Sequence, residues 1–192
     1  MKIVSWNCGG KFREKFLQIQ KFDADIYIIQ ECEDPQKYPN TPYAQFAQNH
    51  IWVGENPNKG LAVFAKDTID ILNNNWEPFC LRHFLSVRIN NAFDLLAVWA
   101  CKPYIEEFYI YQAIHFDKFT SNMVIIGDFN SNAIWDKKNE TRTHTAVVNH
   151  LQSLGLDSAY HIKNHESHGA ETKAHFSCIA IQIRVITSIT LF

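Results

Sequence analysis

The most regular pattern in the chain is a short apolar segment that ends abruptly in polar residues. The run from Met123 to Gly127 contains only apolar side chains and a final glycine, and Asp128 and Asn130 follow it. Because side chains alternate along extended backbone, Asp128 and Asn130 lie on one side of the predicted strand and Phe129 on the other. The pattern predicts a buried strand that presents two polar side chains at its end.

Two earlier segments end in the same way. Residues 1–6 are rich in apolar side chains and precede Asn7, and residues 26–29 precede Gln30 and Glu31. Three strand ends with amide and carboxylate oxygens suit Mg²⁺ or Mn²⁺ and a phosphate better than zinc. Taken singly, each residue is more often a turn residue or a solvated strand end. The combination indicates a site.

Apolar residues at helical spacing predict three helices between the strands. They cover 11–21, 107–119 and 145–154, and Thr143 or Thr145 is the N-cap expected for the last one. The first helix connects two of the polar strand ends. This βαβ-like opening predicts that both strands are buried.

The middle of the chain is dominated by strand-like segments. Residues 34–57 are rich in Pro, Asn and Gln and are predicted to be mostly loop. Strands are predicted over 61–65, 83–89 and 93–99, with a turn at 90–91, as an antiparallel meander. Parallel and hairpin connections in one chain predict a mixed α/β layered sandwich.

Composition narrows the class of protein without identifying a substrate. A chain of 192 residues that is 46% hydrophobic fits one domain. Its net charge of -2 carries no basic signature of nucleic-acid binding. No signal-peptide pattern or apolar run of transmembrane length is present, so we expect a cytoplasmic monomer without membrane contact. Scattered cysteines without a C-x-x-C pair fit a reducing compartment. They are Cys8, Cys32, Cys80, Cys101 and Cys178.

Four segments together resemble the endonuclease/exonuclease/phosphatase superfamily. They are Ser5-Trp6-Asn7, Ile29-Gln30-Glu31-Cys32, Lys59-Gly60-Leu61-Ala62-Val63 and Ile126-Gly127-Asp128-Phe129-Asn130. The resemblance covers the chain to about Phe176. It implies a four-layer α/β sandwich of two mixed β-sheets flanked by helices, like that of deoxyribonuclease I. It also implies a metal-dependent phosphodiesterase or phosphatase whose substrate contains phosphate, with nucleic acid among the candidates.

The same resemblance implies a role for each residue at the strand ends. Glu31 would hold the metal ion, Mg²⁺ or Mn²⁺, and Asp128 would position or activate the attacking water. Asn7 and Asn130 would contact the phosphate and orient the neighbouring carboxylates. The loop after the last strand end offers two further candidates for substrate contact, although its composition alone explains them too: Asn132 and Asp136.

The C-terminal segment departs from the family pattern. Family members carry a late Asp-Tyr-type segment and a final Ser-Asp-His, whereas residues 178–192 contain no acid and no histidine. We therefore predict a family-like domain over 1–176, with its last strands incomplete, and a frameshifted tail over 177–192. The alternative is a genuine β-strand, because isoleucine and valine alternate with other residues over 179–185.

Three other functions stay open. Without the Asp-His pair, the chain could be a non-catalytic remnant of the fold that binds metal or phosphate. A zinc protein could use His161, His165 and His168, although their polar surroundings are typical of a solvated loop. A cysteine hydrolase could use Cys8 or Cys32, but the sequence places no histidine to activate either thiol.

The frameshift hypothesis predicts what the coding DNA contains after codon 176. One spelling of the tail encodes a segment with His-Ile-Asp-Tyr when it is read two nucleotides later. We expect the shifted frame to continue through that motif to a Ser-Asp-His, because the loss of one base near Phe176 would produce this pattern. Sequencing the coding DNA is the measurement. A shifted frame that lacks these motifs contradicts the hypothesis and leaves the strand alternative.

Overall fold

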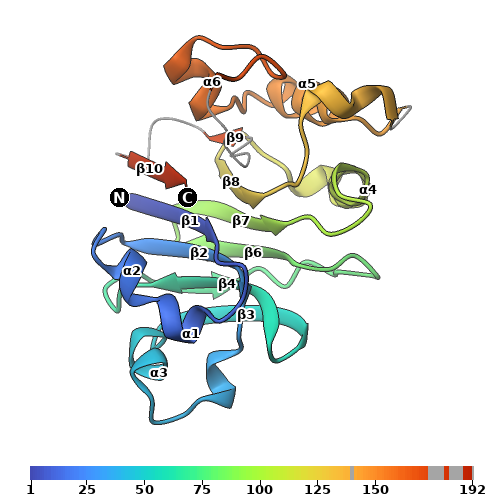
Figure 1. Ribbon diagram of the computed structural model, residues 1–192. Helices are drawn as coiled ribbons and strands as arrows, with labels where there is room; N and C mark the ends of the chain where they lie inside the picture. Colours follow the sequence, from blue (N-terminus) through green and yellow to red (C-terminus); the bar gives the residue numbers. More distant parts are fainter. Residues whose placement is uncertain (139–140, 173–179, 182–187, 192) are drawn as a thin grey trace.

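Two five-stranded sheets pack face to face, and helices cover their outer faces (Figure 1). The computed structural model describes residues 1–138, 141–172, 180–181 and 188–191. Both sheets mix parallel and antiparallel pairs, which confirms the predicted four-layer α/β sandwich. None of the helices in these ranges has the length and apolar character needed to span a bilayer.

The first sheet has the strand order β10-β1-β2-β4-β3. β1 pairs in parallel with β2 and β10, whereas β4 pairs antiparallel with both β2 and β3. Two short helices and a sharp turn connect β1 to β2. The elements are β1 (Lys2–Asn7), α1 (Phe12–Lys15), α2 (Leu17–Gln20), β2 (Ile26–Cys32), β3 (His50–Asn56), β4 (Lys59–Ala65) and β10 (Ser188–Leu191).

The second sheet has the order β5-β6-β7-β8-β9. β7 and β8 are parallel and α4 lies between them in the chain, while the other pairs are antiparallel. The turn predicted at 90–91 is confirmed, because both asparagines adopt positive φ between β6 and β7. The elements are β5 (Ile71–Asn73), β6 (Phe84–Ile89), β7 (Phe93–Trp99), α4 (Ile105–Ile114), β8 (Met123–Asp128) and β9 (Ala180–Ile181).

Alternation along the strands divides the core into three apolar layers. On β2, Ile28 faces the second sheet while Tyr27 and Ile29 face α1–α3. On β8, Ile126 faces the first sheet and Ile125 packs under α4 and α5. The remaining helices are α3 (Pro42–Phe46), α5 (His144–Ser153) and α6 (Ala159–Asn164), and the 3₁₀ turns are η1 (Pro35–Lys37), η2 (Phe116–Lys118) and η3 (Ala133–Lys138).

Several predicted elements need correction. The helix predicted over 11–21 is two short helices separated at Phe16. The loop predicted over 34–57 is wrong where it contains α3 and β3, because the alternation of β3 is short and flanked by polar residues. The predicted meander is wrong because β4 belongs to the first sheet. Thr143 is the N-cap of α5, as predicted, and its Oγ1 accepts from the N–H of Ala146 at 3.0 Å.

The tail supplies an edge strand to each sheet. β10 pairs with β1, and β9 pairs with β8. The predicted boundary at residue 176 lies outside the described residues, as does most of the segment from 177 to 187. The frameshift therefore stays a prediction.

Gly127 allows β8 to approach β7 just before the polar strand end. Its φ is +148°, and a Cβ added there would lie 1.9 Å from the carbonyl oxygen of Val98. Val98 is the register partner of Gly127 in the parallel ladder. A side chain at this position would push the two strands apart, so the glycine is required by the geometry.

We predict that Gly127→Ala destabilises the fold by at least about 3 kcal/mol, because backbone on a buried strand must move. Gly155→Ala is the matched control. Gly155 also has a positive φ, +80°, but the nearest atom to an added Cβ is 3.9 Å away. It should lose only about 1 kcal/mol from backbone strain. Urea unfolding measures both, and equal losses would contradict the steric account.

Candidate active site

Asn7 connects the two carboxylates of the predicted site. Its Nδ2 donates to Asp128 Oδ2 at 2.8 Å and lies 3.3 Å from Glu31 Oε1. The orientation of this amide is set from the other side, where Asn7 Oδ1 accepts from the N–H of Gly9 at 3.0 Å. The amide nitrogen therefore faces both acids, and Asn7 acts here as a donor that spaces and orients them.

Asp128 is buried and firmly held. Its carboxylate accepts from Asn7 Nδ2, from Asn130 Nδ2 at 3.0 Å and from the Asn130 N–H at 2.9 Å. Asn130 Nδ2 also donates to the carbonyl of Ala100 at 3.2 Å, which ties it to the chain after β7. A carboxylate has about four lone-pair sites, so one remains for a further donor such as water.

Glu31 lies on an irregularity of β2. The register with β4 shifts between Gln30 and Cys32, so Glu31 has no direct cross-strand partner. Its φ is +65°, and that of Asn130 is +47°. Asparagine tolerates this conformation, whereas for glutamate it is costly and occurs where the surrounding structure enforces it, often at functional sites. The side chains of Glu31 and Asn130 therefore leave the backbone in directions that a regular strand would not give them.

Lys59 supplies the positive charge beside Glu31. Its Nζ lies 3.0 Å from Glu31 Oε2 and 5.3 Å from the centroid of the Trp99 ring. Trp99 is the register partner of Asp128, and the ring of His83 packs against the Trp99 ring, with their centroids 4.4 Å apart. Lys59, Trp99 and His83 together form a wall beside Glu31. Burial lowers the pKa of His83, so it is neutral at pH 7 and Lys59 carries the charge of this wall.

The structure brings together all four predicted site residues from three different strands, although their chemical roles stay predictions. The two loop candidates have other partners. Asp136 accepts from the N–H groups of His144 and Thr145 at the start of α5, and Asn132 donates to Glu171. The sequence assigned no role to Lys59 or His83, and core packing was the use expected of Trp99, which is buried. Lys59 had one signal, its position in a motif of the family, but its pairing with Glu31 depends on the register of β2 and β4.

The two buried thiols near the site do not favour a cysteine hydrolase. Cys8 Sγ donates to the carbonyl of Gln30 at 3.2 Å, and burial raises the pKa of Cys8 to about 12. Cys32 is fully buried, which raises its pKa well above the ordinary value. Both therefore remain neutral thiols, which are poor nucleophiles. The cysteines within the described ranges are all free.

The three histidines of the zinc alternative do not form one cluster. α6 ends at Asn164, and His165 caps it with a left-handed φ of +56°, so the three histidines do not share one helix face. His161 and His168 nevertheless stack, with ring centroids 3.6 Å apart. Glu171 is the third side chain of this cluster, in the place expected for His165.

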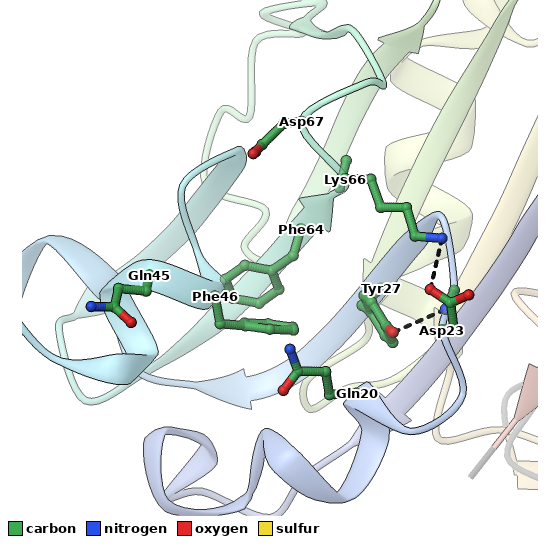
Figure 2. A pocket seen from close by; sticks show the side chains of 10 residues that line it. Gln20, Asp23, Tyr27, Gln45, Phe46, Phe64, Lys66 and Asp67 are labelled. Carbon is green, nitrogen blue, oxygen red and sulfur yellow. Dashed lines mark hydrogen bonds and ion pairs between the residues drawn. The ribbon is translucent and has the colours of Figure 1, made fainter.

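A separate hollow of about 280 Å³ lies at the opposite end of the first sheet (Figure 2). Tyr27, at the start of β2, and Phe64, near the end of β4, form its apolar side. Lys66 Nζ and Asp23 Oδ1 pair at its rim at 2.8 Å. Because Glu31 and Lys59 occupy the other ends of these two strands, the hollow is distinct from the carboxylate site.

Comparison with known proteins places the fold. No family model matches the sequence, and no curated protein matches it. An AP endonuclease from Archaeoglobus fulgidus matches with a TM-score of 0.60 and 15% identity over 95% of this chain and 79% of that one. The 3'-5' exonuclease from Neisseria meningitidis matches with a TM-score of 0.55 and 15% identity, over 83% and 73%.

A third solved structure of the same kind is the endonuclease domain of the telomere-specific non-LTR retrotransposon TRAS1. It matches with a TM-score of 0.54 and 17% identity, over 82% of this chain and 72% of that one. The similarity in structure establishes a shared fold, and at identities this low it establishes the fold alone.

We predict that Asn7→Asp destabilises the protein by about 2–4 kcal/mol at pH 7, because it replaces a bridging donor by a third acid. Like charges raise the folded-state pKa of the new acid above its unfolded value. The loss is therefore present at neutral pH and shrinks as pH falls through that raised pKa. Urea unfolding across pH measures it. Asn58→Asp, the same change at an exposed position, should alter stability by less than about 0.5 kcal/mol. Equal effects would show that Asn7 does not bridge the acids.

Proposed function

We propose that this chain, which has the deoxyribonuclease-I-like fold of endonuclease/exonuclease/phosphatase proteins, is a metal-dependent hydrolase of phosphodiester or phosphomonoester bonds. One observation carries the proposal. Asn7, Glu31, Asp128 and Asn130 form a single hydrogen-bonded group where strands of the two sheets end together. That group supplies the carboxylates and amide donors that phosphoryl transfer requires.

The donor set fits a hard divalent cation. Glu31 and Asp128 offer carboxylate oxygens, and Asn7 holds them on a common side. Oxygen ligands of this kind suit Mg²⁺ or Mn²⁺. Glu31 would hold the ion, and the half-exposed side chain of Lys59 is free to give up its contact with Glu31. The bound ion would neutralise charge on a phosphoryl oxygen.

Asp128 would activate the attacking water, and the amides of Asn7 and Asn130 would orient the Asp128 carboxylate. Asp128 keeps one acceptor site beside its three hydrogen bonds, and we assign that site to the attacking water. The Asn130 amide fixes the carboxylate plane from one side and Asn7 fixes it from the other. Each amide has two N–H hydrogens, so it can keep its hydrogen bond to Asp128 and exchange the second, to Glu31 or to the Ala100 carbonyl, for a phosphate oxygen. This is the substrate-binding role we assign to both.

Nucleic acid is the substrate class we favour. The structurally similar proteins are described as endonucleases and an exonuclease. The half-exposed side chain of Lys59, beside Glu31, can meet a backbone phosphate. The free cysteines of the described residues fit a reducing compartment, so we place the activity in the cytoplasm.

The composition of the C-terminal segment favours a second candidate, a metal- or phosphate-binding remnant without turnover. Residues 178–192 contain no histidine and no acid, so they cannot supply the Asp-His pair of the family. Loss of one donor to the transition state typically lowers the rate by about 10² to 10³. We therefore expect hydrolysis by this chain to be slow compared with that of a frame-restored version.

The proposal predicts the effect of removing each acid. Glu31→Gln and Asp128→Asn should each lower kcat by at least about 10² on a DNA oligonucleotide and on a generic phosphodiester, because the metal ligand or the water-orienting group is lost. Chelation by EDTA should abolish turnover, and Mg²⁺ or Mn²⁺ should restore it. The assay is run on this chain and on the frame-restored version.

Two exposed acids provide matched controls for the same chemical changes. Glu77→Gln and Asp117→Asn should leave the rate unchanged, because both exposed residues lie near His115, at the end of α4 that is distant from the site. Mg²⁺ binding by calorimetry that requires Glu31, with no hydrolysis in either version, would favour the remnant. Hydrolysis that survives chelation and both site variants would overturn the proposal.

A further inference from the structure

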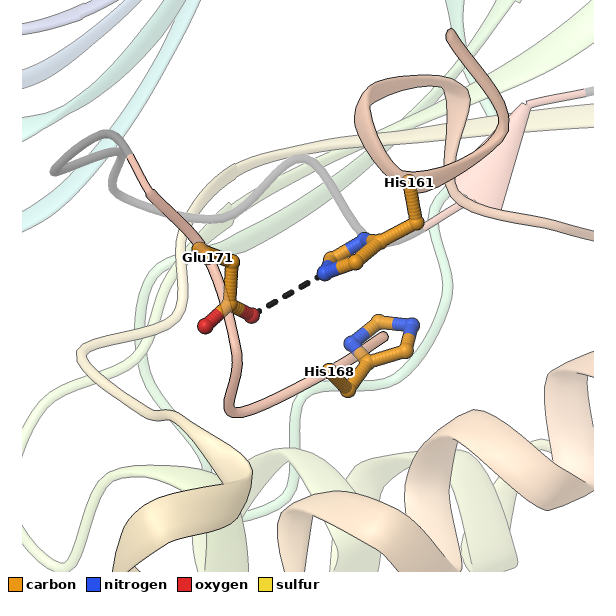
Figure 3. A group of neighbouring side chains, drawn as sticks. All are labelled: His161, His168 and Glu171. Carbon is orange, nitrogen blue, oxygen red and sulfur yellow. Dashed lines mark hydrogen bonds and ion pairs between the residues drawn. The ribbon is translucent and has the colours of Figure 1, made fainter. Parts of the chain in front are cut away.

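A second group of metal-binding side chains lies beyond α5. His161 on α6 and His168 and Glu171 on the following loop each place a potential ligand atom within 4.8 Å of the others (Figure 3). His161 Nε2 and Glu171 Oε1 are 3.0 Å apart. Two ligands on a tetrahedral zinc ion, each at about 2.0–2.1 Å, are separated by about 3.4 Å. The group is therefore close to the spacing of one coordination shell.

The group is sheltered and its carboxylate is held by donors. The side chains of His161 and Glu171 are only 11% and 9% exposed. Glu171 accepts hydrogen bonds from Asn132 Nδ2 and from the Gly169 N–H, both at 3.0 Å, and its Oε1 lies 3.0 Å from His161 Nε2. A carboxylate thus faces two imidazole rings, and both are ligand types that zinc takes in proteins.

Each of the three side chains is also held from behind. Metal-binding histidines and carboxylates typically have an outer partner that fixes their orientation. Here His161 Nδ1 is 2.7 Å from Ser158 Oγ, His168 Nδ1 is 3.2 Å from His144 Nε2, and Glu171 Oε2 accepts from Asn132 Nδ2 at 3.0 Å. The ring of His144 is in turn 3.2 Å from the hydroxyl of Ser131. The arrangement is preorganised by residues of three separate segments.

We propose that His161, His168 and Glu171 bind a divalent transition-metal ion, with Zn²⁺ the best match. Two imidazole nitrogens and one carboxylate favour a borderline-soft ion, in contrast to the oxygen-rich group around Glu31. Three protein ligands leave one further position on a tetrahedral ion.

The position of this group suggests what the ion does. Ser131 and Asn132, which contact His144 and Glu171, directly follow Asn130 in the chain. An ion at this site would therefore brace α6 and the loop to Thr172 against the loop that leaves the strand end of β8. Its role would be structural support for that loop, separate from the chemistry at Glu31 and Asp128.

The direct test is titration of the metal-free full chain with Zn²⁺ by calorimetry, repeated with Co²⁺ and visible absorption to report tetrahedral nitrogen and oxygen ligands. We expect one tight site in addition to any Mg²⁺ site. His161→Gln, His168→Gln and Glu171→Gln should each weaken Zn²⁺ binding by at least about 100-fold, which exceeds the usual effect of losing an outer partner. His165→Asn is the matched control, since asparagine tolerates the left-handed backbone there, and it should bind Zn²⁺ like the original chain.

Two further measurements keep the outcome clear. Glu31→Gln should leave Zn²⁺ binding intact, so failure of the proposed hydrolase and failure of this site are distinguishable. If a ligand variant does not fold, hydrogen exchange of the original chain answers the question, because Zn²⁺ should slow exchange across residues 158–172. Absence of Zn²⁺ binding, binding that survives all three ligand variants, or unchanged exchange in that segment overturns the proposal.

Discussion

The hydrogen bond from Asn7 to Asp128 joins the two sheets at the polar end of their shared core. Asn7 ends β1 in the first sheet, and Asp128 ends β8 in the second. The layer between the sheets is built from apolar side chains such as Ile28 and Ile126. A buried carboxylate at the end of such a layer is costly unless donors surround it. The amides of Asn7 and Asn130 meet that requirement, and the geometry of the site follows from it.

Unusual backbone geometry is part of the same site. Glu31 has a left-handed φ value, and Gly127 occupies a position where no side chain fits. The regular pairing of the flanking strands offsets these costs and holds the strained residues in position. A site built in this way is rigid before any ligand arrives, which is the preorganisation that electrostatic stabilisation of a transition state needs.

The strand ends could be predicted from sequence because an apolar run followed by Asp128 or by Glu31 is a local signal. The carboxyl ends of β1 and β2 meet because those strands are parallel, and the helical spacing between them already indicated it. β3 could not be found in the same way, because an edge strand needs apolar residues on one face only and His50 begins it within polar surroundings. Lys59 received no role because its contact with Glu31 depends on a bulge in β2.

The histidines also show that sequence spacing does not predict which side chains meet in the folded chain. The zinc alternative grouped His161, His165 and His168 because they are close in sequence, but α6 ends before His165 and the fold brings Glu171 to the other two histidines. Propensity describes one segment at a time, whereas this cluster draws on α5, α6 and two loops. Two chemically different groups therefore lie on either side of the loop after β8. One is rich in oxygen, and the other combines imidazole nitrogen with a carboxylate.

The central claim is that Glu31 and Asp128 form a metal and phosphate site. The most direct measurement is an anomalous difference map from crystals of the chain containing Mn²⁺ and phosphate. The account predicts a Mn²⁺ peak in contact with the Glu31 carboxylate, on the side facing Asp128, with the Lys59 contact released. Mn²⁺ bound only at other places, with the contacts of Glu31 to Lys59 and Asn7 unchanged, would contradict it.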